Sequence, residues 1–312
     1  MKKLILLLAG FALLMTTACK NAGFKRTKSG LLYKIVSDGK GQKVKNHDFI
    51  KFHYVSKVHD SVMASTFGNI PAYAPVDSAV GPIYNPAEIF PMLRAGDSAV
   101  VVLLADSLRR KQGGLPSFIK RKDKLVFTFK VLSILPDESS VQKDQMEIVN
   151  SIKSQEEKSL QDYLTKHNIQ AQKTEKGTFV VVQNAGDGMA ADSGKLVKVK
   201  YTGRTLDGKV FDSNQDSAFG HTNPYSIIIY GSPAIEGWHD GLRSFKKGGK
   251  GQLYIPSMLA YGPNPPQGSK IKPFENLVFD VEIIDVTDAP QRTVQPPRGV
   301  RDSAGVNKPS KK

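Results

Sequence analysis

The stretch LVKVKYTGR at residues 196–204 occurs twice in this 312-residue chain, in two related versions. Its counterpart is FIKFHYVSK at residues 49–57, and the tyrosines Tyr54 and Tyr201 lie 147 residues apart. Both versions are rich in β-branched and aromatic residues that alternate with polar ones, a pattern that predicts a β-strand with one buried face. A repeat over this distance predicts two copies of one domain.

Two further pairs of segments extend the repeat over most of each copy. SGLLYKIVSDGKGQ at 29–42 resembles KGTFVVVQNAGDGM at 176–189, and DKLVFTFKVLSIL resembles ENLVFDVEIIDV. Phe127 and Phe279 of the last pair lie 152 residues apart, so the copies differ by a few inserted or deleted residues. Each copy reads as several short strands interrupted by a single helix. This order predicts an α+β fold, with a mainly antiparallel sheet packed on one short helix.

The composition is that of an ordinary folded protein, with 40% hydrophobic and 23% charged residues, which excludes disorder of the whole chain. We assign residues 29–135 to the first copy and 175–287 to the second. Residues 136–174 join them, and their central part lacks Pro and Gly, which predicts a long helix. Its broken apolar stripe favours a rigid spacer about 40 Å long over a dimerisation surface. The stripe consists of Met146, Val149, Ile152, Leu160 and Leu164.

The N-terminal residues 1–18 have the features of a secretory signal, because Lys2 and Lys3 precede a short apolar run. Cys19 is the only cysteine of the chain, so it cannot form an internal disulfide. Its place directly after TTA resembles the lipobox of bacterial lipoproteins, in which the cysteine receives lipid. We therefore expect a lipid anchor at Cys19, with a soluble periplasmic protein cleaved after Ala18 as the alternative.

The regions that flank the two copies are expected to be simple. Residues 19–28 form an N-terminal tether, and Lys20 after the cysteine favours the outer membrane over the inner one. Residues 288–312 are Pro-rich, polar and basic, which predicts a disordered tail. No segment beyond the signal is long and apolar enough to cross a membrane.

The only tryptophan of the chain, Trp238, lies in SPAIEGWHDGLRSF at 232–245. Pro233 suits a first helical position, and the apolar residues that follow recur at helical spacing on one face. These residues are Ile235, Trp238, Leu242 and Phe245. Judged by spacing alone, Trp238 is a core residue.

Four ordered motifs of the second copy resemble the FKBP-type peptidyl-prolyl cis/trans isomerases. They are VKVKYTGRTLDGKVFDS, AIEGWHDGL, LAYG and NLVFDVEIIDV. The resemblance implies two FKBP-like domains, a pocket in the second with the tryptophan as its floor, and no cofactor or metal. It also implies isomerisation of X-Pro bonds in unfolded or exported polypeptides, which would assist their folding in the bacterial envelope.

The family's roles can be carried over onto matching positions of the second copy. The catalytic residues would be Tyr201, Phe211, Asp212, Trp238, Tyr261 and Phe279. The substrate-binding residues would be Tyr225, Ala234 and Ile235, with Ile271 in the flap loop. Asp212 would face the substrate carbonyl, the Ile235 N–H would hold the peptide, and the Tyr261 hydroxyl would bond a substrate oxygen.

The first copy departs from the pattern at the positions that matter most. Met63 and Ala64 stand where the second copy has its Phe and Asp, and Pro86 lies near the tryptophan position. We therefore predict a degenerate copy that has lost the pocket. The alternative for the whole chain is a chaperone that binds unfolded chains without isomerisation, which has no need of the intact pocket set in the second copy.

Other functional signals are weak. KKGGKG at 246–251 lacks the spacing of a phosphate loop and predicts a turn. The six histidines show no paired ligand spacing, so we expect no metal site, and we expect His221 and His239 at the surface. No nucleophile-elbow motif of a Ser hydrolase is present.

The net charge of +15 is concentrated in the first copy. Residues 20–135 hold 19 basic and 8 acidic residues, whereas 177–287 hold 11 of each. Much of the excess lies in SLRRKQGGLPSFIKRKDK, the segment in the flap position. We expect it to bind anionic lipid head groups or acidic clients and not nucleic acid, which an exported lipoprotein rarely meets. The alternative is a solvated surface; the residues concerned are Arg109, Arg110, Lys111, Lys120, Arg121 and Lys122.

Overall fold

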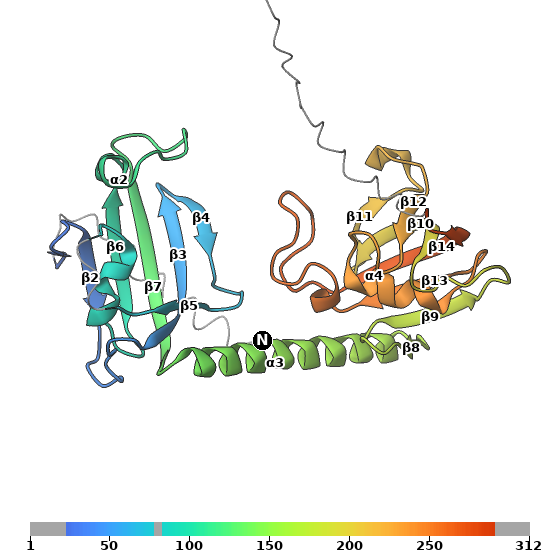
Figure 1. Ribbon diagram of the computed structural model, residues 1–312, viewed down its shortest axis with the longest axis horizontal. Helices are drawn as coiled ribbons and strands as arrows, with labels where there is room; N and C mark the ends of the chain where they lie inside the picture. Colours follow the sequence, from blue (N-terminus) through green and yellow to red (C-terminus); the bar gives the residue numbers. More distant parts are fainter. Residues whose placement is uncertain (1–22, 78–82, 291–312) are drawn as a thin grey trace, which may run out of the picture. The chain divides into compact units, whose positions relative to one another are not determined.

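The computed structural model describes residues 23–77 and 83–290, which fold into two compact units divided between Ser154 and Gln155 (Figure 1). Each unit is built on one antiparallel sheet with few helices, so the predicted α+β fold with two related domains is confirmed. The predicted signal peptide, Cys19 and nearly all of the basic tail lie outside the described residues.

The sheet of the first unit has seven strands in the order β1-β2-β6-β7-β3-β4, and β5 also pairs with β3 (Figure 1). Its strands are β1 (Lys25–Arg26), β2 (Leu32–Val36), β3 (Phe49–Val58), β4 (Ser61–Ser65), β5 (Ala72–Pro75), β6 (Ser98–Leu104) and β7 (Lys124–Leu135). Two helical segments accompany them, the 3-10 helix η1 (Pro86–Met92) and α2 (Ala105–Gln112). The helix α2 was not predicted; it occupies the basic segment that we expected to be a loop.

The sheet of the second unit has the order β11-β10-β14-β13-β9-β8, and β12 also pairs with β10. Its strands are β8 (Gln172–Lys173), β9 (Phe179–Asn184), β10 (Lys195–Thr205), β11 (Val210–Ser213), β12 (Tyr225–Ile228), β13 (Lys250–Ile255) and β14 (Leu277–Asp288). The helical segments are η2 (Ser217–Phe219), α4 (Glu236–Gly241), η3 (Leu242–Ser244) and η4 (Ser257–Leu259). Strand by strand, this order is that of the first unit.

The repeat extends to irregularities of the sheets. The pairing of β3 with β7 shifts between Lys51 and Phe52, and the pairing of β10 with β14 shifts between Lys198 and Val199, which are 147 residues further on. A bulge bends a strand and increases its local twist. The same bend is therefore built into the central strand of both sheets.

A carboxylate ties the short helical segment of each unit to the turn before the first long strand. In the first unit, Glu88 of η1 accepts hydrogen bonds from the backbone N–H and hydroxyl of Ser29. In the second, Asp240 of α4 accepts bonds from the Thr174 hydroxyl and from the backbone N–H of Thr178. Each helical segment is thus fixed against its own sheet by one acidic side chain.

The helix α4 begins three residues later than the sequence predicts. Ile235 is its N-cap with an extended backbone, and Pro233 lies in the preceding loop, where its carbonyl oxygen accepts a bond from the Tyr225 hydroxyl at 3.3 Å. The apolar residues at helical spacing still face the core, because Trp238, Leu242 and Phe245 are at most 5% exposed.

The long helix α3 (Glu138–Lys166) lies where the sequence predicts one, and the boundary between the two units falls within it. In the first unit, Asp144 binds the Lys51 ammonium at 2.8 Å and accepts a bond from the Tyr73 hydroxyl. In the second unit, Leu160 and Leu164 are buried against a cluster of apolar residues from β9, β13 and β14. Leu160 and Leu164 of the predicted apolar stripe are therefore explained by packing within the second unit.

Candidate functional site

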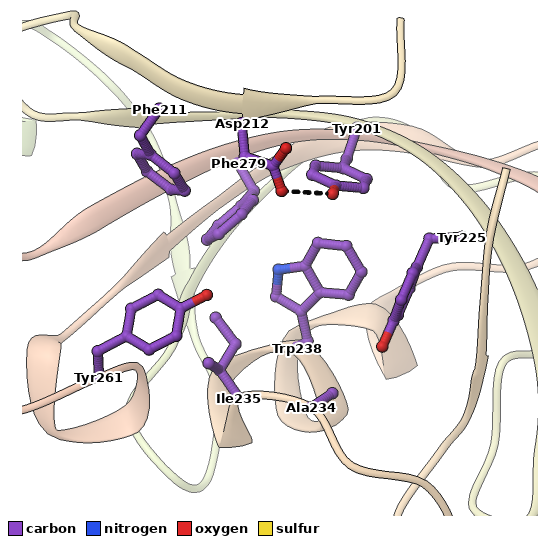
Figure 2. Close-up of a pocket in the computed structure, with 9 residues that line it drawn as sticks. All are labelled: Tyr201, Phe211, Asp212, Tyr225, Ala234, Ile235, Trp238, Tyr261 and Phe279. Carbon is purple, nitrogen blue, oxygen red and sulfur yellow. Dashed lines mark hydrogen bonds between the residues drawn. The ribbon is translucent and has the colours of Figure 1, made fainter. Parts of the chain in front are cut away.

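Nine side chains of the second unit line a pocket of about 180 Å³ between α4 and the concave side of the sheet (Figure 2). They come from strands β10, β11, β12 and β14, from α4 and the loop before it, and from the turn after η4. The nine are Tyr201, Phe211, Asp212, Tyr225, Ala234, Ile235, Trp238, Tyr261 and Phe279. All of them are residues that the sequence selects, although they are spread over 79 positions from Tyr201 to Phe279.

Trp238 lies at the base of this pocket and is surrounded by rings that stand edge-on to it (Figure 2). The ring centroids of Tyr201, Tyr225 and Phe279 lie 5.0, 5.5 and 5.3 Å from that of Trp238, at interplanar angles of 80–87°. Perpendicular packing of this kind is favourable because the positive edge of one ring meets the negative face of another. Trp238 is 5% exposed, so it belongs to the core and forms the pocket floor at the same time.

Gly203 makes the aromatic wall possible, and the sequence analysis did not select it. A Cβ atom at this position would lie 2.7 Å from the Phe211 ring and 2.8 Å from the Phe279 ring. Without it, the two rings meet with centroids 5.6 Å apart. The position has a sequence signal, because residues i and i+2 of a strand share one face, so Gly203 lies on the same face as Tyr201.

Asp212 is held by two neighbours at the rim of the pocket. Its carboxylate accepts a 2.6 Å bond from the Tyr201 hydroxyl (Figure 2) and lies 3.2 Å from His221 Nε2. Burial, and then the carboxylate of Asp212, raise the pKa of Tyr201 above its usual range, so the hydroxyl keeps its proton at neutral pH. A carboxylate only accepts hydrogen bonds, so Asp212 orients Tyr201 and places a negative charge at the rim.

Two hydrogen-bond donors of the pocket have no acceptor among the described residues. The indole Nε1 of Trp238 is buried without a partner, and the Tyr261 hydroxyl makes no hydrogen bond within the part of the chain described. Figure 2 shows this hydroxyl turned toward the other rings. Burial, followed by the charge of Asp212, raises the pKa of Tyr261, which keeps it a donor. The pocket thus offers two donors to a ligand that carries oxygen acceptors.

Ile235 and Ile271 occupy different environments. Ile235 lines the pocket as the N-cap of α4, so its own N–H lies outside the bonding pattern of the helix. Ile271 does not line the pocket; its side chain is 7% exposed and packs in the hydrophobic core of the unit. Its neighbours Lys270 and Lys272 are exposed, so Ile271 points inward between two lysines that face solvent.

The surface positions expected for the two histidines hold only in part. His239 is buried, at 5% exposure, because the Tyr230 ring stacks on it with centroids 5.2 Å apart, and its Nδ1 accepts a bond from the backbone N–H of Tyr230 at 3.0 Å. The expectation for it was wrong. His221 is exposed, but it contacts Asp212 and lies 3.4 Å from the Tyr201 hydroxyl, so it belongs to the pocket rim.

Within 23–77 and 83–290, no three His, Cys, Asp or Glu side chains lie in an arrangement that could hold a metal ion. In the same ranges, no helix is both long and apolar enough to cross a membrane.

Comparison with known proteins places the pocket in a family. Residues 188–284 match the family described as "FKBP-type peptidyl-prolyl cis-trans isomerase". This part of the chain belongs to the FKBP family. The matched range contains all nine residues of the pocket, and it leaves out α3 and the whole first unit.

Individual relatives match the same part of the chain. "FKBP-type peptidyl-prolyl cis-trans isomerase FkpA" of Escherichia coli (strain K12) is 41% identical over 120 residues, which are 38% of this chain and 42% of that protein. A "Probable FKBP-type peptidyl-prolyl cis-trans isomerase" of Haemophilus influenzae is 39% identical over 113 residues, 36% of this chain and 44% of that protein. The similarity therefore covers less than half the length of these relatives and centres on the FKBP domain.

Among solved structures, the chain is similar to the "Crystal structure of FkpA from Escherichia coli". The two share 33% sequence identity, with 49% of this chain and 75% of that chain covered. The TM-score is 0.36.

Proposed function

We propose that the second unit catalyses cis/trans isomerisation of X-Pro bonds in polypeptides of the bacterial envelope. The observation that carries the proposal is the pocket itself, in which six aromatic side chains and an aspartate converge within a domain of the FKBP family. Two of the aromatic residues, Trp238 and Tyr261, carry hydrogen-bond donors without an acceptor among the described residues. The proposed reaction needs no nucleophile, because no covalent bond is broken.

The chemistry of the reaction suits such a pocket. Rotation about an X-Pro bond is slow because the amide loses its resonance as it twists, at a barrier of about 18–20 kcal/mol. In the twisted state the carbonyl is less polarised than in the planar amide, so an apolar site that excludes water favours the twisted state over the planar one. The ring of a bound proline would lie on Trp238, which is buried and apolar.

Polar groups of the pocket would hold the flanking peptide. The Tyr261 hydroxyl and the Ile235 N–H would donate to carbonyl oxygens of the substrate. The protonated Tyr201 keeps Asp212 in place, and the carboxylate would lie beside the carbonyl of the twisting bond. Each of these groups is fixed before substrate arrives, which lowers the cost of orienting it in the transition state.

The envelope location and the clients are also part of this proposal. The signal at residues 1–18 and the lipobox-like sequence before Cys19 support export and lipid anchoring at the outer membrane, with a soluble periplasmic protein as the alternative. The substrates would then be proline-containing unfolded polypeptides on their way through that compartment. Mass spectrometry of the mature N-terminus tests the anchor, and an unmodified Cys19 would contradict it.

A protease-coupled isomerisation assay on the full chain tests the catalytic proposal. We expect acceleration of the cis-to-trans step of a Leu-Pro peptide, and loss of most of it in Trp238→Ala. A chaperone that only binds unfolded chains would suppress aggregation of a denatured client without accelerating the peptide. That result with the wild-type chain would replace our proposal by the chaperone alternative.

A further inference from the structure

The basic segment of the first unit keeps its acidic residues engaged internally. Residues 105–124, formed by α2 and the loop before β7, carry seven basic and two acidic side chains. Asp106 pairs with both Arg110 and Arg121, so it joins the helix to the loop. Asp123 is 8% exposed, accepts a 2.8 Å bond from the backbone of Lys120 and lies 3.1 Å from His59. The charge that this segment presents to solvent is therefore strongly positive.

An aromatic side chain stands exposed in the middle of these charges. Phe118 is 57% exposed, whereas the adjacent Ile119 is 4% exposed and packs in a small cluster with Val58 and Ala105. The guanidinium of Arg109 donates to the Ile119 carbonyl, which fixes the loop to the helix. Phe118 thus faces outward from a loop that is held in place, and Figure 1 shows the segment at the end of the first sheet.

We infer that this surface, residues 105–124, docks on a bilayer that contains anionic lipid. Cationic side chains gather at a negatively charged membrane surface, and each strengthens binding about fivefold. An exposed ring among them adds to the binding free energy when it is buried at the boundary between head groups and acyl chains. An acidic protein or a nucleic acid would also complement the charge, and an exposed ring could contact either. The export signal and the lipobox-like sequence before Cys19 favour the bilayer as the partner. A lipid anchor at Cys19 would keep the surface close to such a bilayer.

Vesicle flotation tests this inference with the full chain carrying Cys19→Ser, which takes no lipid. The probe is a vesicle of 30% phosphatidylglycerol in phosphatidylcholine at low salt, compared with pure phosphatidylcholine. We expect binding only to the anionic vesicles, about 100-fold weaker for the triple variant Lys120→Gln, Arg121→Gln, Lys122→Gln. Phe118→Ser should weaken binding by about tenfold without changing the charge.

The matched control removes three exposed lysines from another loop of the same unit, with Lys40→Gln, Lys43→Gln and Lys45→Gln. It should retain most of the binding. Equal losses in the two triple variants would show that only total charge matters, and would overturn the assignment. So would the absence of binding at low salt, or tighter binding to RNA that depends on the same three residues.

A second and independent observation concerns Glu156 of α3. This side chain is 7% exposed; one carboxylate oxygen accepts the Ser257 hydroxyl and the other lies 3.1 Å from the backbone nitrogen of Met258. Both partners belong to the 3-10 turn η4, which leads directly into Tyr261. The Ser257 carbonyl in turn accepts the backbone N–H of Gly262 at 2.8 Å. The carboxylate is therefore connected to both sides of the pocket tyrosine.

We propose that Glu156 is a positioning residue for Tyr261. It lies outside the range that matches the FKBP family, so a residue of the long helix supports a wall of the FKBP pocket. The inference rests on the proposed isomerase function, because the position of Tyr261 is read out through catalysis. Removing a carboxylate that satisfies two donors leaves them unpaired and frees the turn to move.

A double-mutant cycle on the full chain tests this role. Glu156→Ala should lower kcat/KM about tenfold, whereas Glu156→Gln, which keeps an acceptor for the backbone N–H, should stay within about twofold of wild type. In a Tyr261→Phe background, Glu156→Ala should have little further effect. The neighbouring Glu157→Ala is the matched control, because Glu157 is half-buried and, among the described residues, its carboxylate contacts Lys173 and Gln161.

The outcomes separate the two proposals. An inactive wild-type chain would contradict the isomerase function itself. An active chain in which Glu156→Ala and Tyr261→Phe act additively would contradict only the positioning role. If Glu156→Ala fails to fold, a Glu156→Gln variant that folds normally but loses activity as strongly as Tyr261→Phe would also contradict it.

Discussion

The two units share one sheet topology but differ in the residues that stand at the pocket positions. Both have seven strands in the same order, the same bulge in the central strand and a carboxylate that ties the helical segment to the sheet. Their strand registers align position by position, since Ser56 pairs with Ala64 and Phe127 just as Gly203 pairs with Asp212 and Phe279. Of the six aromatic positions of the pocket, Tyr54 and Phe127 are the two that keep an aromatic residue in the first unit.

The remaining pocket positions differ in ways that abolish the aromatic cup. The register and the matching bridges of the two units place small or aliphatic residues where the second unit has rings and an acid. Met63, Ala64, Ala72 and Pro86 of the first unit stand where Phe211, Asp212, Tyr225 and Trp238 stand in the second.

The comparison separates what makes the fold from what makes the site. The fold depends on backbone pairing and on apolar residues of suitable size, and many combinations satisfy both requirements. Phe90 of η1 fills the first unit, with its ring centroid 5.5 Å from that of Phe52 and 5.8 Å from that of Phe129. The first unit thus has a packed core where the second has a pocket floor, although the strand order of the two sheets is the same.

Removing the pocket floor should produce the largest difference in activity between matched variants of the two units. Trp238→Ala should lower kcat/KM about 100-fold, since the proline ring loses the surface that orients it. It should also cost about 3–5 kcal/mol of the unfolding free energy of the second unit. The matched variant Phe90→Ala should destabilise the first unit by a similar amount and leave the isomerisation rate unchanged. A comparable loss of activity in both variants would show that the first unit takes part in catalysis.

Exchanging a single residue between the units should have the next largest effect. Gly203→Ser imports the residue of the first unit and places a Cβ within 2.8 Å of two pocket rings. The rings must move, so we expect kcat/KM to fall about tenfold, at a cost of about 1–3 kcal/mol of stability. The reciprocal Ser56→Gly should cost about 0.5–1 kcal/mol through backbone freedom and leave activity intact. A Gly203→Ser enzyme with wild-type activity would contradict the importance of this contact.

The sequence predicts the fold and the pocket well because both rest on local patterns. Strand periodicity and the repeat are sufficient to indicate two related α+β domains, and the four motifs contain eight of the nine pocket residues, all but Tyr225. What the sequence misses depends on contacts between distant segments. Nothing local to Glu156 indicates that it binds a turn 101 residues further along the chain. The burial of His239 and the turning inward of Ile271 are likewise decided by what packs over them.

Helix boundaries show a second limit of sequence reasoning. Pro233 is compatible with a first helical position, but the loop before α4 is held by Ser232, whose hydroxyl bonds the backbone of Ile228 at 2.9 Å. The helix therefore begins only after Ile235. In the first unit, the basic segment is helical over Ala105–Gln112, since Leu108 can be buried there while Arg110 faces solvent. A pattern of charges alone did not indicate that helix.

Removing one donor should have a smaller effect than removing a ring. Tyr261→Phe keeps the ring of the pocket wall and deletes the hydroxyl that would bond a substrate carbonyl. A neutral hydrogen bond contributes about 0.5–1.5 kcal/mol, which corresponds to a decrease of about two- to tenfold in kcat/KM. Steady-state kinetics on a Leu-Pro peptide would measure it. An unchanged kcat/KM would show that this hydroxyl does not bind the substrate.

The smallest expected effect is a dependence of the stability of the second unit on pH, set by His239. Burial lowers the pKa of this histidine in the folded protein, and its Nδ1 must stay unprotonated to accept the Tyr230 N–H. As the pH falls below about 6.5, the unfolded chain takes up a proton that the folded chain does not, so the unfolding free energy decreases.

Urea unfolding at pH 7.5 and 5.5 would measure this decrease. The fluorescence of the single tryptophan is the probe, because it reports the second unit alone. His239→Gln should lose less stability on acidification than wild type, whereas His167→Gln, exposed at the end of α3, should behave as wild type does. An identical loss in wild type and His239→Gln would mean that other groups cause the acid sensitivity.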